Sequence, residues 1–303
     1  MKRFAVLLCV GLAVLAALTA TLAARPETTR PAITGIAYVH IYTTNLDEAS
    51  KFYKMVLAAA PALPSLDPKA APITIEPLPK NNDGTDLLKE VAFFTADAEG
   101  LRKYLASKGL TPEKMTKCAG EHCFAIQDPE NHRLVFVQQS NAKTPDANWT
   151  PIIHAGFIVK DRASMDKFYK DVLDYRVYWH GGMKDDETSW VDMQVPEGAD
   201  WVEYMLGAGP NPNAHTRGVL NHIALGVPDI HVAQQKLLQA GWKPGEEPKI
   251  GRDGKWQLNL YDPDFTRVEF MEYTPAEKPC CAPITGPNPG PPPASPIHNG
   301  GAE

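Results

Sequence analysis

One pattern, repeated four times, constrains this chain more than any other feature. Each copy begins with a short apolar strand near residue 36, 90, 152 or 221, and an amphipathic helix follows it. An Asn or Asp lies seven residues after the same strand position in every copy, where it would cap the helix: Asn45, Asp97, Asp161 and Asp229. Repetition at this spacing predicts a single structural unit built four times.

The helices and the last strands of the copies match as well. Phe52 and Tyr53 occupy the same helix positions as Phe168 and Tyr169, within matching apolar stripes. An Asp-Pro turn at 128 or 262 then leads into an alternating apolar strand. The sequence therefore predicts an α+β fold of four βαβββ units, paired into an N-terminal domain (33–140) and a C-terminal domain (151–274) with a linker between them (141–150).

The two ends of the chain differ from the repeats. Lys2 and Arg3 precede 21 uncharged residues, which is typical of an export signal over 1–24. The same stretch is also long enough for an uncleaved membrane anchor. Either alternative predicts a folded part outside the cytoplasm, periplasmic or extracellular. From Pro275 onward, nine of 29 residues are proline, and this composition predicts a disordered tail over 275–303.

The overall charge narrows the class of partner. A formal net charge of -6 gives no electrostatic reason to expect a nucleic acid or an anionic membrane surface. We expect a small-molecule substrate, no nucleic acid, and no membrane contact beyond the possible N-terminal anchor.

Four polar side chains in the third and fourth copies carry the candidate chemistry. Alternation along each strand places His154, Glu203, His222 and Glu269 on the face opposite the apolar residues that contact the helices. His154 and Glu203 are 49 residues apart, and His222 and Glu269 are 47 apart, so each copy contributes one His and one Glu. Two such copies packed by pseudo-two-fold symmetry would bring all four together. Two imidazoles and two carboxylates suit one divalent ion such as Zn, Ni, Mn or Fe.

The four copies and this residue order resemble the vicinal-oxygen-chelate superfamily, which includes glyoxalase I, methylmalonyl-CoA epimerase, bleomycin-resistance proteins and extradiol dioxygenases. The resemblance covers residues 35–274. It implies curved, partly closed mixed sheets and a metal site in the C-terminal domain. The set His154, Glu203, His222 and Glu269 is similar to the ligands of glyoxalase I and the epimerase, whereas the subset without Glu203 is similar to the iron triad of the dioxygenases.

The resemblance implies three functions. In a lyase or isomerase of the glyoxalase and epimerase type, Glu203 or Glu269 would be the catalytic base that removes a proton beside a carbonyl group. In an Fe(II)-dependent ring-cleaving dioxygenase, a Tyr is expected where this chain has Asn259, with Tyr261 two residues further along. The third function is non-catalytic binding of a small molecule. We expect the first of these, because Asn259 departs from the tyrosine of the dioxygenases and because the binders generally lack the metal set.

The first two copies lack a complete ligand set. Tyr38, Glu90 and Val135 occupy the positions of His154, His222 and Glu269, and Glu76 is a candidate counterpart of Glu203. We therefore expect the N-terminal domain to bind no metal. Cys118 and Cys123 are placed to bridge the two arms of a hairpin in an oxidising compartment.

Overall fold

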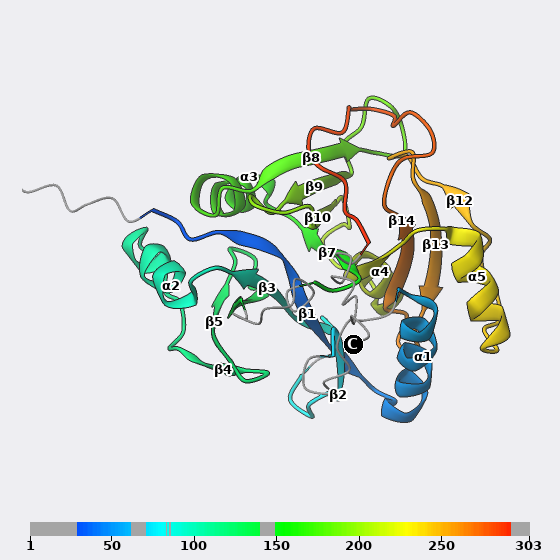
Figure 1. The fold of residues 1–303 in the computed structure, drawn as a ribbon, viewed down its shortest axis with the longest axis horizontal. Coiled ribbons are helices and arrows are strands. Elements are labelled where there is room, and N and C mark those ends of the chain that lie inside the picture. The colour runs from blue at the N-terminus through cyan, green and yellow to red at the C-terminus, as the bar shows by residue number, and fades with distance from the viewer. Residues whose placement is uncertain (1–28, 62–70, 83, 85, 140–148, 292–303) are drawn as a thin grey trace, which may run out of the picture.

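A computed structural model describes residues 29–61, 71–82, 84, 86–139 and 149–291 (Figure 1). The expected export signal or anchor (1–24) and most of the expected linker lie outside the described residues. Within the described ranges, no helix is long and apolar enough to cross a membrane.

The first sheet contains the first two units. Its strands are ordered β2-β1-β3-β6-β5-β4. The bounds are β1 (Ile33–Thr43), β2 (Ile73–Pro77), β3 (Leu88–Thr95), β4 (Thr116–Cys118), β5 (Glu121–Gln127) and β6 (Arg133–Gln138). The central pair β1–β3 is antiparallel, and β2 and β6 flank it in parallel.

The second sheet repeats this plan with more strands, in the order β12-β13-β14-β11-β7-β10-β9-β8. The bounds are β7 (Ile152–Val159), β8 (Arg176–Gly181), β9 (Trp190–Gln194), β10 (Trp201–Leu206), β11 (His222–Val227), β12 (Lys249–Ile250), β13 (Trp256–Tyr261) and β14 (Arg267–Glu272). The central pair β7–β11 is again antiparallel, with β10 and β14 parallel to its two members. The α+β fold of two mixed sheets, each made by two units, is therefore confirmed.

Each unit's helix begins at the predicted cap. The helices are α1 (Leu46–Ala59), α2 (Ala98–Ser107), α3 (Arg162–Asp166), which continues as the π-helical turn η3 (Lys167–Val172), and α5 (Ile230–Gln239). The side chains of Asn45, Asp97, Asp161 and Asp229 accept first-turn N–H groups. An additional helix, α4 (Ala214–Leu220), lies between β10 and β11 and is not one of the four repeated helices.

The two domains pack through one shared hydrophobic core. The repeated tyrosines reach across it. The Tyr53 hydroxyl of α1 donates to Asp262 beside β14 at 3.1 Å, and the Tyr169 hydroxyl of η3 donates to Asp128 beside β6 at 3.2 Å. Each contact joins a helix of one domain to the Asp-Pro turn of the other, so the repeat extends to the domain interface.

The prediction of a disordered tail from Pro275 is wrong for residues 275–291. Cys280, Ala282 and Ile284 pack against a cluster that contains Tyr178 and Trp179 of β8. Trp179 Nε1 donates to the Cys280 carbonyl at 3.1 Å, and Thr285 N donates to the Tyr178 carbonyl at 3.0 Å. Proline lacks a backbone donor but keeps its carbonyl acceptor. In this segment Cys280, Ala282 and Ile284 supply the apolar contacts, and Thr285 supplies the N–H group.

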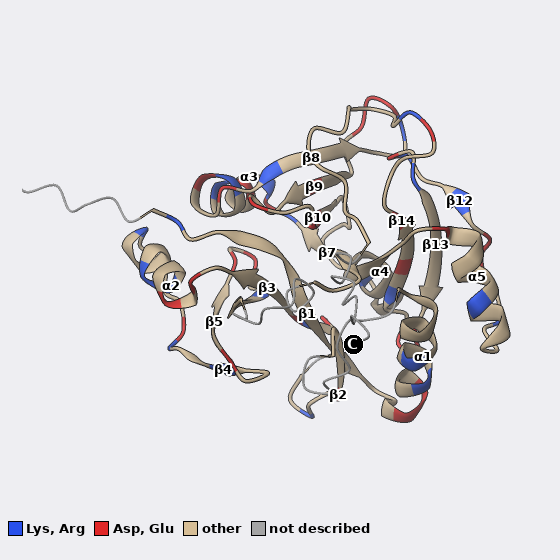
Figure 2. Cartoon of the chain, viewed as in Figure 1, with Lys and Arg blue, Asp and Glu red and all other residues tan. Residues whose placement is uncertain are grey.

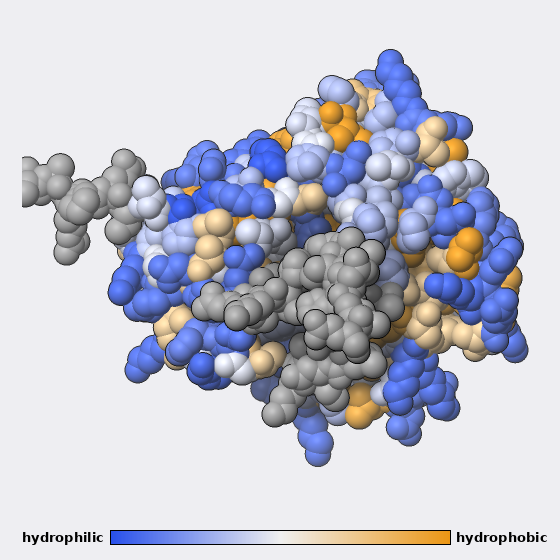
Figure 3. All heavy atoms as spheres, in the orientation of Figure 1, coloured by the Kyte–Doolittle hydropathy of each residue, from blue (hydrophilic) through white to orange (hydrophobic). Residues whose placement is uncertain are grey.

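In the ribbon of Figure 2, acidic and basic residues are interspersed along α1, α2 and α3. Figure 3 shows mainly hydrophilic residues on the same face, with hydrophobic residues in small groups.

Candidate metal centre

The four predicted residues lie on the four central strands of the second sheet. His154 is on β7, His222 begins β11, Glu203 is on β10 and Glu269 is on β14. The strand register brings them together: His154 and Glu269 both lie opposite Ala224, and His222 and Glu203 both lie opposite Gly156. Neighbouring strands are about 5 Å apart, so side chains on one face of these strands meet.

The structure brings all four side chains to one point. His154 Nε2 lies 3.1 Å from His222 Nε2 and 3.7 Å from Glu269 Oε2. Glu203 Oε2 lies 3.0 Å from His222 Nε2 and 3.7 Å from His154 Nε2. The ligand atoms of His154, His222 and Glu269 all lie within 4.8 Å of one another, so these three residues form a possible site for a metal ion.

Gly156 makes room for this cluster. A β-carbon on Gly156 would collide with the His222 ring at Cε1 and Nδ1. The imidazole therefore lies directly over the β7 backbone, and only a residue without a side chain allows that approach.

The buried environment of the two histidines favours their neutral form. Burial is the main cause that lowers the pKa of both well below the usual value, and the charge of Arg267 lowers both further. His222 Nδ1 lies 2.9 Å from the Leu220 carbonyl, which can only accept, so this nitrogen carries the ring proton and Nε2 keeps its lone pair. A neutral imidazole with a free lone pair is the form that binds metals.

The two carboxyl groups share the buried environment. Burial raises the pKa of Glu203 to about 7, against the opposing charge of Arg267. Burial also raises the pKa of Glu269 to about 7, and the charge of Glu203 adds to this effect. A divalent cation among these groups would relieve the repulsion between two carboxylates.

Three titratable residues that the sequence did not single out lie beside the cluster. Asp192 lies directly opposite Glu203 in the β9–β10 pair, and burial raises its pKa well above the usual value. Burial raises the pKa of Asp253 to about 6 and lowers that of Lys255 to about 8. The Lys255 ammonium lies 5.0 Å from the Tyr178 ring centre and 4.8 Å from that of Trp201.

A cavity of about 380 Å³ opens onto the cluster. Its wall includes His154, Glu203 and Glu269, together with Asp192 and Arg267. Apolar side chains form much of the remainder: Trp179, Met183, Trp190, Trp201, Met205, Val219, Leu220, Ile250 and Met271. A mostly apolar cavity with a few convergent polar groups is typical of a small-molecule site.

The residues expected of a ring-cleaving site lie elsewhere. The Tyr261 hydroxyl donates to Glu246 at 2.7 Å, and Tyr261 is not part of the cavity wall. Asn259 does line the cavity, and its amide also donates to Glu246. Apart from the candidate ligands, the wall has neither a histidine nor a tyrosine among the residues that the structure describes.

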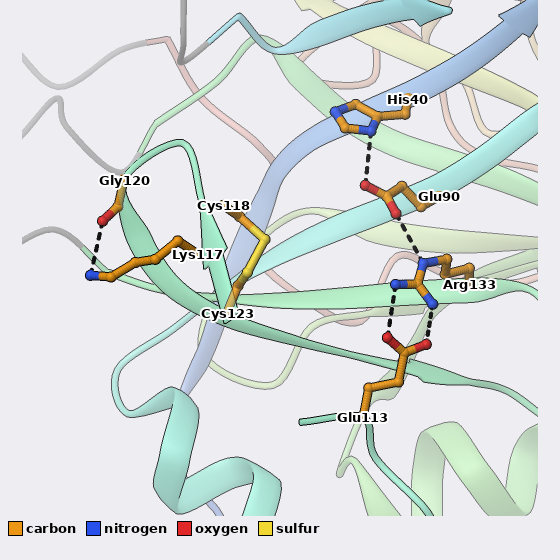
Figure 4. Close-up of a disulfide and its surroundings, with 8 residues drawn as sticks. All are labelled: His40, Glu90, Glu113, Lys117, Cys118, Gly120, Cys123 and Arg133. Carbon is orange, nitrogen blue, oxygen red and sulfur yellow. Dashed lines mark hydrogen bonds and ion pairs between the residues drawn. A yellow bond between two sulfur atoms is a disulfide. The ribbon is translucent and has the colours of Figure 1, made fainter. Parts of the chain in front are cut away.

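The corresponding place in the first sheet is filled by an ion-pair chain (Figure 4). His40 Nδ1 lies 2.9 Å from Glu90, and Arg133 Nε donates to the other Glu90 oxygen at 3.1 Å. Arg133 also pairs with Glu113. Glu203 lies opposite Gly156, and the residue of the first unit that corresponds to Gly156 is His40. Glu76 lies opposite Tyr42, two residues further along, so it is not the counterpart of Glu203. Figure 4 also shows the Cys118–Cys123 disulfide, which joins the arms of the β4–β5 hairpin.

Comparison with known proteins agrees with this architecture. Residues 152–270 match the Glyoxalase/Bleomycin resistance protein/Dioxygenase superfamily. No curated protein matches the sequence.

Several solved structures share the fold. Homoprotocatechuate 2,3-dioxygenase from Brevibacterium fuscum has 18% identity and a TM-score of 0.56, over 81% of this chain and 82% of that one. A room-temperature structure of an extradiol ring-cleaving dioxygenase from B. fuscum gives 16% and 0.58, over 86% and 77%. Homoprotocatechuate 2,3-dioxygenase from Arthrobacter globiformis gives 16% and 0.55, over 82% of each chain.

Proposed function

Because the chain carries a domain of the glyoxalase, bleomycin-resistance and dioxygenase superfamily, we propose that it is a metal-dependent lyase or isomerase of the glyoxalase and epimerase type. Its substrate would be a small molecule with two neighbouring oxygen atoms, one of them a carbonyl oxygen. The reaction would begin with removal of a proton from the carbon beside that carbonyl group.

The donor set fits one divalent ion. His154 and His222 would supply nitrogen ligands, and Glu269 would supply an oxygen ligand. Such an ion would act as a Lewis acid on the substrate oxygens and stabilise the negative charge that develops as the proton leaves.

The second carboxylate is the observation that carries the proposal. Glu203 lies 3.0 Å from His222 and 3.7 Å from His154, in addition to a complete His-His-Glu set, and it lines the cavity. A carboxylate in this place can be a fourth ligand, or it can take the proton from a substrate held beside it. The tryptophan walls would exclude water from the reacting carbon.

Ring cleavage by an Fe(II)-dependent dioxygenase is the second candidate. The His-His-Glu triad and the fold shared with extradiol dioxygenases favour it. The composition of the cavity wall argues against it, because Tyr261 bonds to Glu246 away from the cavity.

Glu203→Gln separates the two reactions. If Glu203 is the base, the variant should keep much of its metal and lose exchange of solvent deuterium into the carbon beside the carbonyl of keto and hydroxy acids. We expect a loss of at least about 100-fold in the exchange rate, as is usual for a general base. Tyr38→Phe, at the position in the first domain that corresponds to His154, is the control and should exchange at the wild-type rate.

Oxygen uptake is measured on the same proteins. If the ferrous wild-type protein takes up oxygen when a catechol is added, and the Glu203→Gln variant does so as well, the proposal is contradicted and the dioxygenase is supported. Deuterium exchange without oxygen uptake would support the lyase or isomerase.

We also propose that the enzyme acts outside the cytoplasm, in the periplasm or beyond. The charged and apolar pattern of 1–24 and the Cys118–Cys123 disulfide support this location. Mass spectrometry of the protein recovered from each compartment tests it: intact protein confined to the cytoplasm would contradict export.

A further inference from the structure

Arg267 contacts the ligand cluster directly. Its Nη2 lies 2.7 Å from His222 Nε2, and its Nη1 lies 3.9 Å from Glu269 Oε2. A guanidinium group only donates, and His222 Nδ1 carries the ring proton, so the contact uses the lone pair on His222 Nε2. That lone pair is the one the proposed metal site needs.

The repeat places an arginine at the same position in the first domain. Arg133 comes five residues after Asp128 of its Asp-Pro turn, and Arg267 comes five residues after Asp262 of the other turn. Arg133 bonds to Glu90, the residue at the His222 position, and to Glu113 (Figure 4). In the first domain an arginine therefore lies between carboxylates, at the place that corresponds to the ligand cluster of the second domain.

The two arginines differ in the strength of their partners. Arg133 is held by two carboxylates, whereas Arg267 bonds to a neutral imidazole and lies beside the Glu269 carboxylate without a hydrogen bond to it. Both arginines make charge-assisted hydrogen bonds, but a carboxylate adds the attraction of an opposite charge, which a neutral imidazole does not offer. Arg267 is therefore the more easily displaced of the pair.

We propose that Arg267 is an internal competitor of the metal ion, and that a divalent cation binds His222 only by displacing it. A single lone pair cannot serve both an N–H group and a metal, and two cations at that point would repel each other. The inference rests on the proposed metal site. It adds that this chain's own arginine sets the affinity of that site.

The displaced guanidinium has a place to go. Its Nη1 already lies 3.4 Å from Asn259 Oδ1, and both Arg267 and Asn259 line the cavity. Among the described residues its Nε has no hydrogen-bond partner. Rotation toward Asn259 would leave the positive charge at the cavity wall, away from His222.

Zn²⁺ binding to the full-length protein tests the inference. Arg267→Met removes the charge and the hydrogen bond but keeps a long side chain, and Arg133→Met is the matched control in the first domain. Affinity is measured by competition with a chromophoric chelator. Arg267→Met should bind Zn²⁺ about tenfold to 100-fold more tightly than wild type, the range expected for a lost hydrogen bond to a charged group. Arg133→Met should match wild type.

The results separate this inference from the proposed function. Zn²⁺ binding by wild type with equal or weaker binding by Arg267→Met overturns only the competition. Absence of Zn²⁺ binding by wild type and both variants overturns the metal site and the competition together.

A measurement on the wild-type protein does not depend on how any variant folds. Nitrogen NMR follows His222 Nε2 and the Arg267 guanidinium while Zn²⁺ is added. The hydrogen-bonded Arg267 signal should disappear in proportion to Zn²⁺ bound, as the His222 Nε2 resonance shifts. An Arg267 signal that is unchanged at full Zn²⁺ occupancy would contradict displacement.

Discussion

At the scale of single residues, the domain interface contains a histidine that should make stability depend on pH. His132 Nδ1 lies 2.8 Å from Asp128, and the His132 ring stacks on Phe157 of the other domain at 4.3 Å. Burial lowers the pKa of His132, but the hydrogen bond and charge of Asp128 outweigh this, so the net pKa is raised above 6.5. The protonated form is therefore stabilised in the folded protein.

The sign of the pH effect follows from this shift. The stabilisation is fully present below pH 6.5, the usual value, and it is lost as pH rises through the higher folded value. His132→Gln should therefore destabilise the protein most at about pH 6, by about 1.5–3 kcal/mol, and less at about pH 9. Chemical unfolding across this range checks it, with the exposed His122→Gln as control. A cost that grows with pH would show that His132 acts through its neutral form.

At the scale of strands, Gly156 should determine whether His222 can lie over β7. Gly156→Ala should push the imidazole away and weaken metal binding at least about tenfold, which is the usual effect of disturbing a ligand's support. Gly245→Ala is the control, because a β-carbon there meets no atom within 4 Å. Unchanged metal affinity in Gly156→Ala would mean that the His222 ring is not held over the strand.

The strand scale also shows what sequence could predict. The caps and the shared face of the four candidate residues were predictable because they depend on short-range rules, the side-chain requirement of a helix N-terminus and the alternation of a strand. Asp192 was not predictable, because it depends on the β9–β10 register, which no local pattern encodes. Arg267 left a signal that was overlooked: it shares strand parity with Glu269 and has a repeat counterpart in Arg133.

At the scale of the whole molecule, the segment 275–291 belongs to the second domain. The Trp179 and Thr285 bonds join it to β8, and Gln194 Nε2 of β9 donates to the Pro287 carbonyl at 2.8 Å. At about 1 kcal/mol each, these three bonds predict that a chain ending at Thr274 loses about 3 kcal/mol of stability. A chain ending at Pro291 keeps all three and is the control. Equal melting temperatures for the two truncated chains would mean that the segment does not contribute.

The composition of that segment explains why its packing was missed. A high proline content argues against helices and central strands, yet it allows an extended chain to pack through Cys280, Ala282 and Ile284. Trp179 is 101 residues away from Cys280 in sequence, so the packing of this segment against β8 leaves no local pattern.

The metal content of the purified full-length protein tests the central claim most directly. Elemental analysis after dialysis against a divalent metal mixture should give about one ion per chain for wild type and for Tyr38→Phe. His222→Ala should retain almost none, because loss of one ligand opens a three-residue site. Metal retained in His222→Ala, or lost in Tyr38→Phe, would contradict a single site in the second domain.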